Sequence, residues 1–203
     1  DIVGLAKSAI PTDIGATSHA SDFCYMTSHD KLTVWTSNYS REFYKKRGNY
    51  IEIGGLEVAR KDDDDRMLEL IRKVGSGKAF GTKAYMISAA EAKEKFPLLE
   101  EDQIQGAMWD PEAGLVTPRS QKVAGDLVDE AVASGKLKTF AYTPATKVLV
   151  EDGVAVGVET PKGTIMADHI VLCAGIWGSL ISETANVKLP LMPLEHPLLF
   201  FGP

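Results

Sequence analysis

The sequence lacks a long hydrophobic run, an excess of basic residues and more than two cysteines. No apolar run approaches the ~20 residues that a membrane-spanning helix needs, so we expect no membrane segment. The chain has 22 lysines and arginines against 28 aspartates and glutamates, a formal net charge of −6. Without a basic cluster, this balance argues against a nucleic-acid-binding protein.

The two cysteines, Cys24 and Cys173, are too few for a disulfide framework. Both lie among apolar neighbours in the sequence, which predicts packed, reduced thiols and a cytoplasmic protein. Each end of the chain reads as part of a strand, over residues 2–5 and 198–201. We therefore expect a domain that is truncated at both its N- and C-terminal ends.

What is present is an ordinary globular composition, 44% hydrophobic and 25% charged over 203 residues. This length suffices for one large domain or for two small ones that share a core. Neither an internal repeat nor a low-complexity segment interrupts it.

The stretch from Gly163 to Leu180 indicates an α/β protein. Residues 170–173 form a short apolar run without a charge, which predicts a strand buried on both faces of a parallel sheet. The run ends on the small residues Ala174 and Gly175, and a helix is expected over 176–184. Ligands of open α/β sheets bind at the carboxyl ends of strands, where small residues let the backbone approach them. The stretch therefore predicts a nucleotide site.

Four further local patterns predict helices and turns. Asp30 is expected to cap a helix that ends near Gly48. An acidic run at 62–65 is interpreted as the first turn of the next helix, where negative charge is favourable, rather than as a metal site. Thr117-Pro118 predicts the start of another helix, and Asp152-Gly153 predicts a tight turn between two strands.

The helix after Asp30 carries apolar residues at helical spacing, which we interpret as its core-facing stripe rather than as a cofactor site. These residues are Leu32, Trp35, Tyr39 and Phe43.

Three segments together resemble one family, the FAD-dependent amine oxidoreductases of the D-amino-acid oxidase type. In particular the chain is similar to the dimethylglycine and sarcosine dehydrogenases and oxidases. The segments are Gly-Ala-Thr-Ser-His-Ala at 15–20, Trp-Asp-Pro-Glu-Ala-Gly-Leu-Val-Thr-Pro at 109–118 with Ala-Gly-Ile-Trp at 174–177, and Met-Pro-Leu-Glu-His at 192–196. They follow the family's order over essentially the whole chain.

The resemblance implies an FAD/NAD(P)-binding (Rossmann-like) domain interleaved with an α+β substrate domain that contains an antiparallel sheet. By analogy, residues 1–29 and 110–185 belong to the FAD-binding domain, and residues 30–109 and 186–203 to the substrate-binding domain. The family's glycine fingerprint for the FAD pyrophosphate would precede residue 1.

In the dimethylglycine-type branch of this family, a histidine at this place carries the flavin covalently, through the 8α-methyl group of the flavin. His19 is therefore the sharpest hypothesis that the resemblance supplies. A neutral imidazole is a nucleophile near pH 7, and a loop of small residues can bring it to the ring edge. The alternative is a loop histidine that is hydrogen-bonded to backbone. The residues that the resemblance assigns to the cofactor are Thr17, Ser18, His19, Val148, Ala174, Gly175 and Trp177, with Val148 against the adenine.

His196 matches an active-site histidine that would orient the substrate amine or accept its proton. No metal is expected. The sequence departs from the family pattern at two positions. Pro197 stands where a polar residue is common, and Ala6 stands where the first strand normally ends on an acid that binds the ribose hydroxyls.

The leading functional hypothesis is oxidative N-demethylation of a small N-methylated amino acid, such as dimethylglycine or sarcosine, by hydride transfer to FAD. Two alternatives stay open. One is an FAD enzyme that acts on another amino acid, a polyamine or glycerol 3-phosphate, and the other is an inactive fragment or non-catalytic homologue. The partners expected are a small-molecule amine and an electron acceptor, either oxygen or an electron-transfer flavoprotein.

Overall fold

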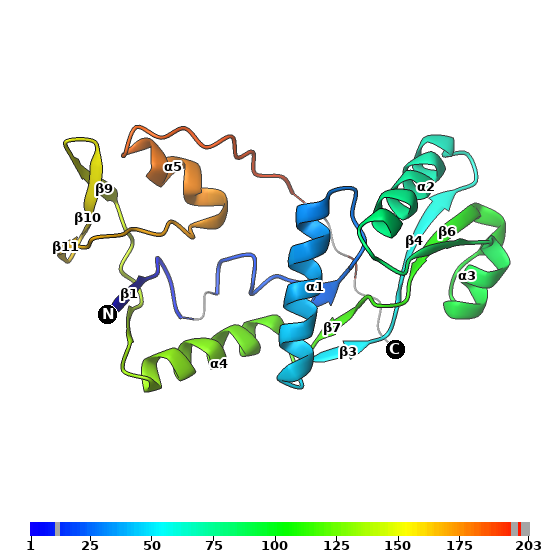
Figure 1. The fold of residues 1–203 in the computed structure, drawn as a ribbon, viewed down its shortest axis with the longest axis horizontal. Coiled ribbons are helices and arrows are strands. Elements are labelled where there is room, and N and C mark those ends of the chain that lie inside the picture. The colour runs from blue at the N-terminus through cyan, green and yellow to red at the C-terminus, as the bar shows by residue number, and fades with distance from the viewer. Residues whose placement is uncertain (11–12, 196–198, 200–203) are drawn as a thin grey trace. The chain divides into compact units, whose positions relative to one another are not determined.

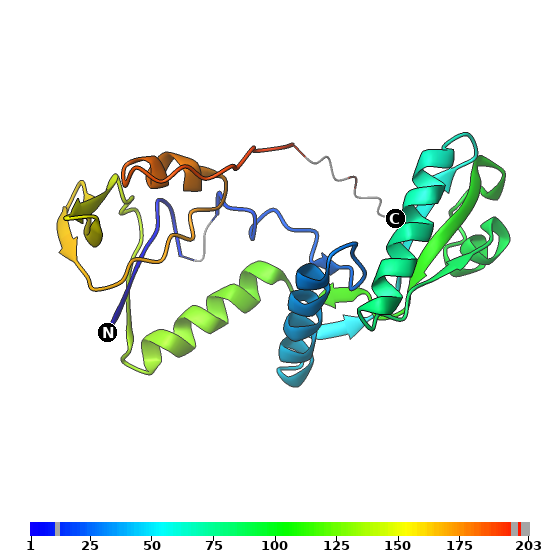
Figure 2. The same cartoon turned by 45° about the horizontal axis from the view of Figure 1, so that its top comes forward.

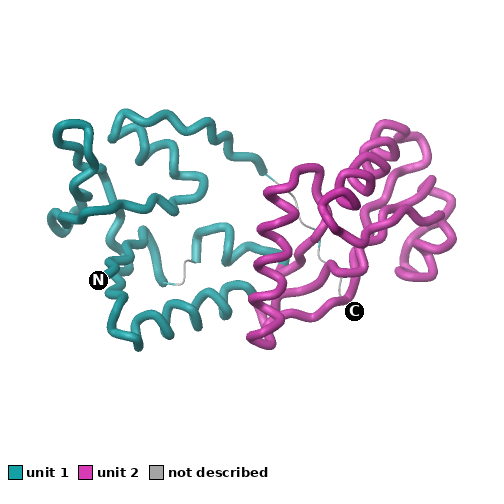
Figure 3. The backbone as a smooth tube through the Cα atoms, in the orientation of Figure 1, with its two compact units in different colours: residues 1–21, 120–203 teal, residues 22–119 magenta. Residues whose placement is uncertain are grey.

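The computed structural model describes residues 1–10, 13–195 and 199. They divide into two compact units, residues 1–21 with 120–203 and residues 22–119 (Figure 3). The helices and strands are mixed in both, as in an α/β protein (Figure 1). Among the described residues, none of the helices has the length and apolar character that crossing a membrane requires.

The unit of residues 22–119 contains two antiparallel sheets. Its elements are β2 (Phe23–Cys24), α1 (Lys31–Lys46), β3 (Tyr50–Glu52), β4 (Gly55–Arg60), α2 (Asp64–Ala79), β5 (Tyr85–Ile87), α3 (Ala89–Lys95), η1 (Glu101–Gln103), β6 (Ile104–Asp110) and β7 (Gly114–Val116). One sheet has the strand order β4-β6-β5 and the other β2-β7-β3.

The central strand β6 is buried on both faces, because a different helix covers each. Met108 packs with Leu70 and Val74 of α2, and Ala107 packs with Ala92 of α3. Successive residues of a strand point to opposite faces, so α2 and α3 lie on opposite sides of this sheet (Figure 2).

The helix α1 is capped as expected, since the backbone N–H of Thr33 donates to Oδ1 of Asp30 over 2.7 Å. The core interpretation of its apolar stripe is wrong. All four residues are exposed to solvent: the exposed fraction is 69% for Leu32, 60% for Trp35, 66% for Tyr39 and 39% for Phe43.

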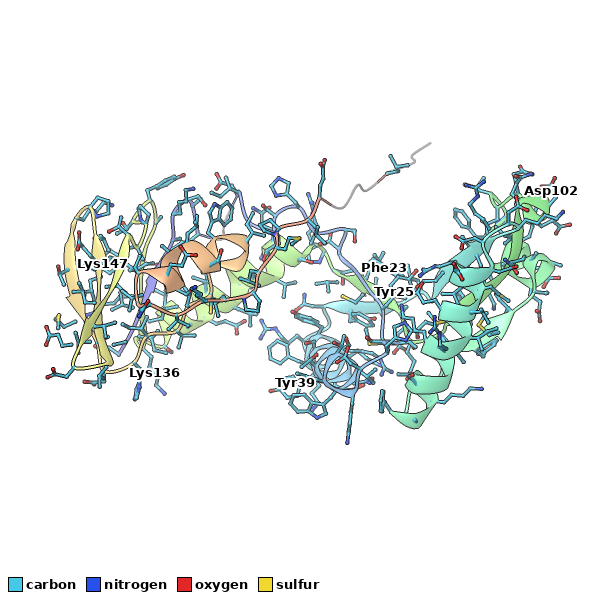
Figure 4. All side chains as sticks on the ribbon, turned by 90° about the horizontal axis from the view of Figure 1, so that it is seen from above. Phe23, Tyr25, Tyr39, Asp102, Lys136 and Lys147 are labelled. Carbon is cyan, nitrogen blue, oxygen red and sulfur yellow. The ribbon has the colours of Figure 1, made fainter. Side chains whose placement is uncertain are left out.

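The physical reason is that α1 buries the opposite, mostly polar face. Val34 is buried on that face, and the Arg41 side chain is only 11% exposed because it pairs with Glu52 and Glu112. The Trp35 and Tyr39 rings stack on the exposed face instead, with centroids 5.7 Å apart. In Figure 4 the labelled Tyr39 lies on α1, away from the labelled pair Phe23 and Tyr25, whose rings meet edge to face.

The unit of residues 1–21 and 120–203 has one parallel pair and one antiparallel sheet. Its elements are β1 (Ile2–Leu5), α4 (Ser120–Ala133), β8 (Leu137–Phe140), β9 (Lys147–Glu151), β10 (Val154–Thr160), β11 (Gly163–Met166), η2 (Gly175–Trp177) and α5 (Gly178–Glu183). β1 pairs with β8 in parallel, and the antiparallel sheet has the order β11-β10-β9.

Local signals in the sequence were reliable here and in the other unit. The turn at Asp152-Gly153 is confirmed: it joins β9 to β10, and both residues have positive φ, 50° and 78°. The helix expected at Thr117-Pro118 is present as α4, but it begins at Ser120, so the start predicted at Thr117-Pro118 is wrong by about one turn. The acidic run is confirmed as a helix start, because Asp63 caps α2 by accepting from the N–H of Arg66 over 3.0 Å.

The buried strand expected at residues 170–173 is wrong. These residues form no strand, and Val171 is 82% exposed. A strand buried on both faces of a parallel sheet needs strand partners beside it, and the only parallel pairing among the described residues is β1 with β8. Cys173 is consequently exposed, so the packed thiol expected there is wrong too, while Cys24 is half-buried and both cysteines are free.

Asp110 links the two sheets of its unit and provides a first test. Its fully buried carboxylate accepts hydrogen bonds from the N–H groups of Met26 and Thr27, both over 3.0 Å, and from that of Glu112 over 3.3 Å.

Asp110→Ala leaves three buried donors without an acceptor, each costing about 1–3 kcal/mol. We expect the free energy of unfolding to fall by at least ~3 kcal/mol in urea titrations. The exposed control Asp62→Ala should change it little, and equal effects of the two would refute the linking role.

Gly54 allows a second stability test, because an added Cβ would lie 2.0 Å from a ring carbon of Trp109 and φ is +76°. That ring is covered by Lys95, whose Nζ lies 4.3 Å from its centroid. We expect Gly54→Ala to destabilise the protein by more than ~2 kcal/mol.

Gly75 is the matched control for Gly54. It lies inside α2 with open space around it, so Gly75→Ala should stabilise the helix by up to ~1 kcal/mol. Thermal unfolding measures the melting temperatures of both variants. If Gly54→Ala raised the melting temperature as Gly75→Ala does, the close packing at Gly54 would be contradicted.

Candidate functional site

The loop between β1 and β2 carries three of the predicted cofactor residues, Thr17, Ser18 and His19. Consecutive backbone turns shape it: the N–H of Ser18 donates to Gly15 O over 3.1 Å, and that of His19 donates to Ala16 O over 3.2 Å. Thr17 and Ser18 are half-buried, whereas His19 is exposed. The loop thus presents the imidazole outward on a short, hydrogen-bonded turn.

The imidazole of His19 is held through one of its two nitrogens. Nδ1 lies 3.1 Å from Gly15 O and 2.9 Å from Ser18 Oγ. The backbone hydrogen bond expected for a structural histidine is therefore present. Among the residues that the structure describes, the contacts of this ring run through Nδ1, which leaves Nε2 available for chemistry.

The corner at residues 174–177 lies in the same compact unit as this loop. Gly175 opens η2 with φ +52° and open space beside its Cα, and the N–H of Trp177 donates to Ala174 O over 3.0 Å. A ligand can therefore approach this backbone closely, as small residues at a corner permit.

Val148 is tied to the helix that follows this corner. Its side chain is buried in β9, and its N–H donates to Thr184 Oγ1 over 2.9 Å just after α5. The structure thus connects Val148 to the corner through α5. Because this N–H is already used by Thr184, it is not available to a ligand.

Lys7 is a neighbour of the predicted site that sequence reasoning missed. Its Nζ lies 5.1 Å from the centroid of the Trp177 ring, a cation–π distance. Lys7 follows Ala6, the position where the family pattern has an acid. The only signal in the sequence was this basic residue at the end of β1, and nothing in the pattern paired it with Trp177. His196 and Pro197 lie outside the described residues.

A hollow lies within the unit of residues 22–119, between α1 and the β2-β7-β3 sheet. Its volume is about 270 Å³, and it is lined by Cys24, Met26, Thr36, Ser37, Ser40, Arg41, Tyr44 and Tyr50. Burial, with the nearby charge of Asp22, raises the pKa of the Cys24 thiol, and burial raises the pKa of Tyr50. Both groups are therefore protonated at neutral pH.

The charge of Arg41 in this hollow is already matched. Its Nε and Nη2 donate over 2.8 Å each to Glu52 and Glu112, and Lys45 and Lys83 join the same carboxylates. Hydrogen bonds from Lys45 and Arg41 lower the pKa of Glu52. The hollow therefore offers hydroxyl groups but no unmatched cation for an anionic ligand.

Comparisons with known proteins agree with the resemblance seen in the sequence. Sarcosine dehydrogenase of Homo sapiens is 33% identical over 165 residues, which cover 77% of this chain and 17% of that protein. The pyruvate dehydrogenase phosphatase regulatory subunit of Mus musculus is 28% identical over 212 residues, 100% of this chain and 23% of that protein. The chain thus spans about a fifth of these relatives.

Solved structures show the same fold. The crystal structure of L-proline dehydrogenase from P. horikoshii superposes with a TM-score of 0.76 and 26% identity, over 92% of this chain and 49% of that one. The sequence profile of the family described as FAD dependent oxidoreductase, abbreviated DAO, matches residues 1–203. The chain therefore belongs to the DAO family of FAD dependent oxidoreductases.

Proposed function

We propose that this protein oxidises a small N-methylated amino acid, of the sarcosine or dimethylglycine type, and removes its methyl group with FAD as the hydride acceptor. The family match and the 33% identity to sarcosine dehydrogenase support this substrate class. The observation that carries the proposal is the His19 loop, which exposes an imidazole that the described part of the chain holds through Nδ1.

The described residues fit an FAD site at two places. The loop of Thr17, Ser18 and His19 would hold the flavin ring edge, with Nε2 of His19 bonded to the 8α-carbon. The open backbone at Ala174 and Gly175, with Trp177 behind it, would line the rest of the cofactor, and Val148 would contact the adenine. When bound, FAD supplies a two-electron acceptor for the N-methyl carbon.

Covalent attachment at His19 would be an oxidation of the 8α-methyl group. Nε2 would take the place of one hydrogen of that group, with one proton lost from the carbon and one from Nδ1, and molecular oxygen would be the oxidant that accepts the two electrons. Nδ1 faces Gly15 O and Ser18 Oγ, two oxygens that can stabilise its proton until it departs to water.

The remaining assignments are proposals of the same kind. Residues 1–29 and 110–185 would form the FAD-binding part, and residues 30–109 and 186–203 the substrate-binding part. His196 would orient the substrate amine or accept its proton. The electron acceptor would be oxygen or an electron-transfer flavoprotein. The cytoplasmic location stays a prediction, and the sarcosine dehydrogenase compared above is described as mitochondrial.

A second candidate function has one specific observation in its favour. One relative that aligns with the whole chain, from Mus musculus, is described as a regulatory subunit. A non-catalytic member of the family, in which the site binds FAD without turnover, is therefore the alternative.

Covalent attachment is tested by acid precipitation of the flavoprotein. We expect yellow, fluorescent flavin in the wild-type pellet and on a denaturing gel. His19→Ala should release all flavin to the supernatant because no other imidazole replaces Nε2. The control His29→Ala, which alters an exposed histidine 3.6 Å from Glu69, should keep the flavin in the pellet. Flavin in the wild-type supernatant would exclude attachment at His19.

The substrate class is tested by anaerobic bleaching of the flavin. Sarcosine or dimethylglycine should reduce the 450-nm-region absorbance and release formaldehyde after hydrolysis of the imine, since the hydride leaves an N-methyl carbon. Glycine, polyamines and glycerol 3-phosphate serve as the comparison set. Bleaching by one of these instead would reassign the substrate, and bleaching by none would favour the non-catalytic candidate.

A further inference from the structure

The hollow between α1 and the β2-β7-β3 sheet has the lining of a small-molecule site: we infer that it binds an uncharged cyclic polyol of about the size of a monosaccharide. All the residues that line the hollow belong to the unit of residues 22–119, so the site is formed within one compact unit. The inference goes beyond the proposed function and does not rest on it.

The face of α1 that lines the hollow is polar along two turns. Ser37, Ser40, Arg41 and Tyr44 all line it, and their spacing of three, four and seven residues places them on one side of the helix. The inward face of a surface helix is normally apolar. Here it presents a row of hydrogen-bonding groups to the hollow instead.

The hydroxyls on this face are not all used by the helix itself. Thr36 bonds back to the preceding turn, donating to two of its carbonyl oxygens over 3.0 Å each, as helical hydroxyls commonly do. In the part of the chain that the structure describes, the hydroxyls of Ser37, Ser40 and Tyr44 make no hydrogen bond to the protein. Each can both donate and accept, so together they match the hydroxyls of a polyol.

The charges around the hollow favour an uncharged ligand. Arg41 is the cationic residue of the lining, and it already donates to Glu52 and Glu112 over 2.8 Å each. Burial raises the pKa of the Cys24 thiol and of Tyr50, so both stay neutral. A carboxylate or a phosphate would find no unmatched cation in this lining, and the guanidinium repels a cationic ligand. The zwitterionic amino acid of the proposed function therefore does not suit the hollow.

Size and apolar surface narrow the class of ligand further. The volume of about 270 Å³ equals that of about nine water molecules in the liquid, which is enough for a monosaccharide and too little for a dinucleotide. Met26, which is 2% exposed, and the rings of Tyr44 and Tyr50 bring apolar surface to the lining. A cyclic polyol can place its C–H faces against such surface and its hydroxyls against the serines, and ligand pockets commonly combine these two kinds of contact.

Cys24 can report whether the hollow is occupied, because it lines the hollow, and Cys173 is the internal control. Both cysteines are free, and Cys173 is exposed in the other unit. The whole protein is alkylated with iodoacetamide at mildly alkaline pH, where the reactive thiolates form, and mass spectrometry follows each cysteine separately. We expect myo-inositol to slow the labelling of Cys24 along a saturation curve and to leave the rate at Cys173 unchanged.

Variants that each remove one hydroxyl locate the bound polyol. Ser37→Ala and Tyr44→Phe should each raise the half-protecting concentration of myo-inositol about fivefold, the effect of losing one hydrogen bond. The matched control Tyr39→Phe removes a hydroxyl from the outward face of the same helix, where Tyr39 is 66% exposed, and should leave that concentration unchanged. Alanine and phenylalanine are at least as favourable in a helix as the residues they replace, so all three variants should fold.

Two further compounds separate binding in the hollow from other causes of protection. myo-Inositol 1-phosphate should protect Cys24 less well than myo-inositol, because its charge is unmatched. Trimethylamine N-oxide, an osmolyte that is excluded from protein surfaces, should give no saturation curve.

Three results would each overturn the inference. They are the absence of saturable protection by myo-inositol, protection by the phosphate or the osmolyte that equals that of myo-inositol, and hydroxyl variants that both behave like Tyr39→Phe. Flavin takes no part in this measurement, so a failure of flavin attachment at His19 would leave its result unaffected.

Discussion

The buried carboxylate of Asp110 is the constraint on which the unit of residues 22–119 depends. It ends the central strand β6 and binds the backbone just after β2 and at the start of the turn before β7. This fixes Glu112, two residues later, where it accepts from Arg41 and Lys83. Arg41 in turn holds α1 with its polar face inward. A single desolvated acceptor therefore determines how two sheets and a helix are joined, as expected for a buried charge that is fully hydrogen-bonded.

The elements that the sequence predicted correctly are those defined by local chemistry. Asp30 caps its helix with its own side chain, and Asp152-Gly153 adopts the positive φ angles that its turn requires. The main errors concern burial. The apolar run at 170–173, with the Cys173 thiol in it, and the aromatic stripe from Leu32 to Phe43 were expected in a core, yet they are exposed. Apolar spacing shows that residues share a face, but contacts from distant segments, such as that of Arg41 with Glu112, decide whether that face is buried.

The predictions about the candidate site also divide into what a local pattern could give and what depends on contacts in the folded chain. The resemblance identified the loop around His19 and the corner at Gly175, because small residues leave a recognisable pattern. It could not show that Gly15 O gathers the donors of Ser18 and His19, nor that Lys7 lies against the Trp177 ring. Those contacts depend on side-chain directions that no spacing rule specifies.

The inverted orientation of α1 has a consequence for how this protein tolerates sequence change. In most surface helices the aromatic positions are constrained and the charged ones drift. Here the outward Trp35 and Tyr39 can be replaced by polar residues with little effect on folding, whereas loss of the inward Arg41 removes the guanidinium that joins Glu52 to Glu112 and leaves each carboxylate with a lysine alone. Along this helix, sequence variation among related proteins should therefore be greatest at its exposed apolar residues.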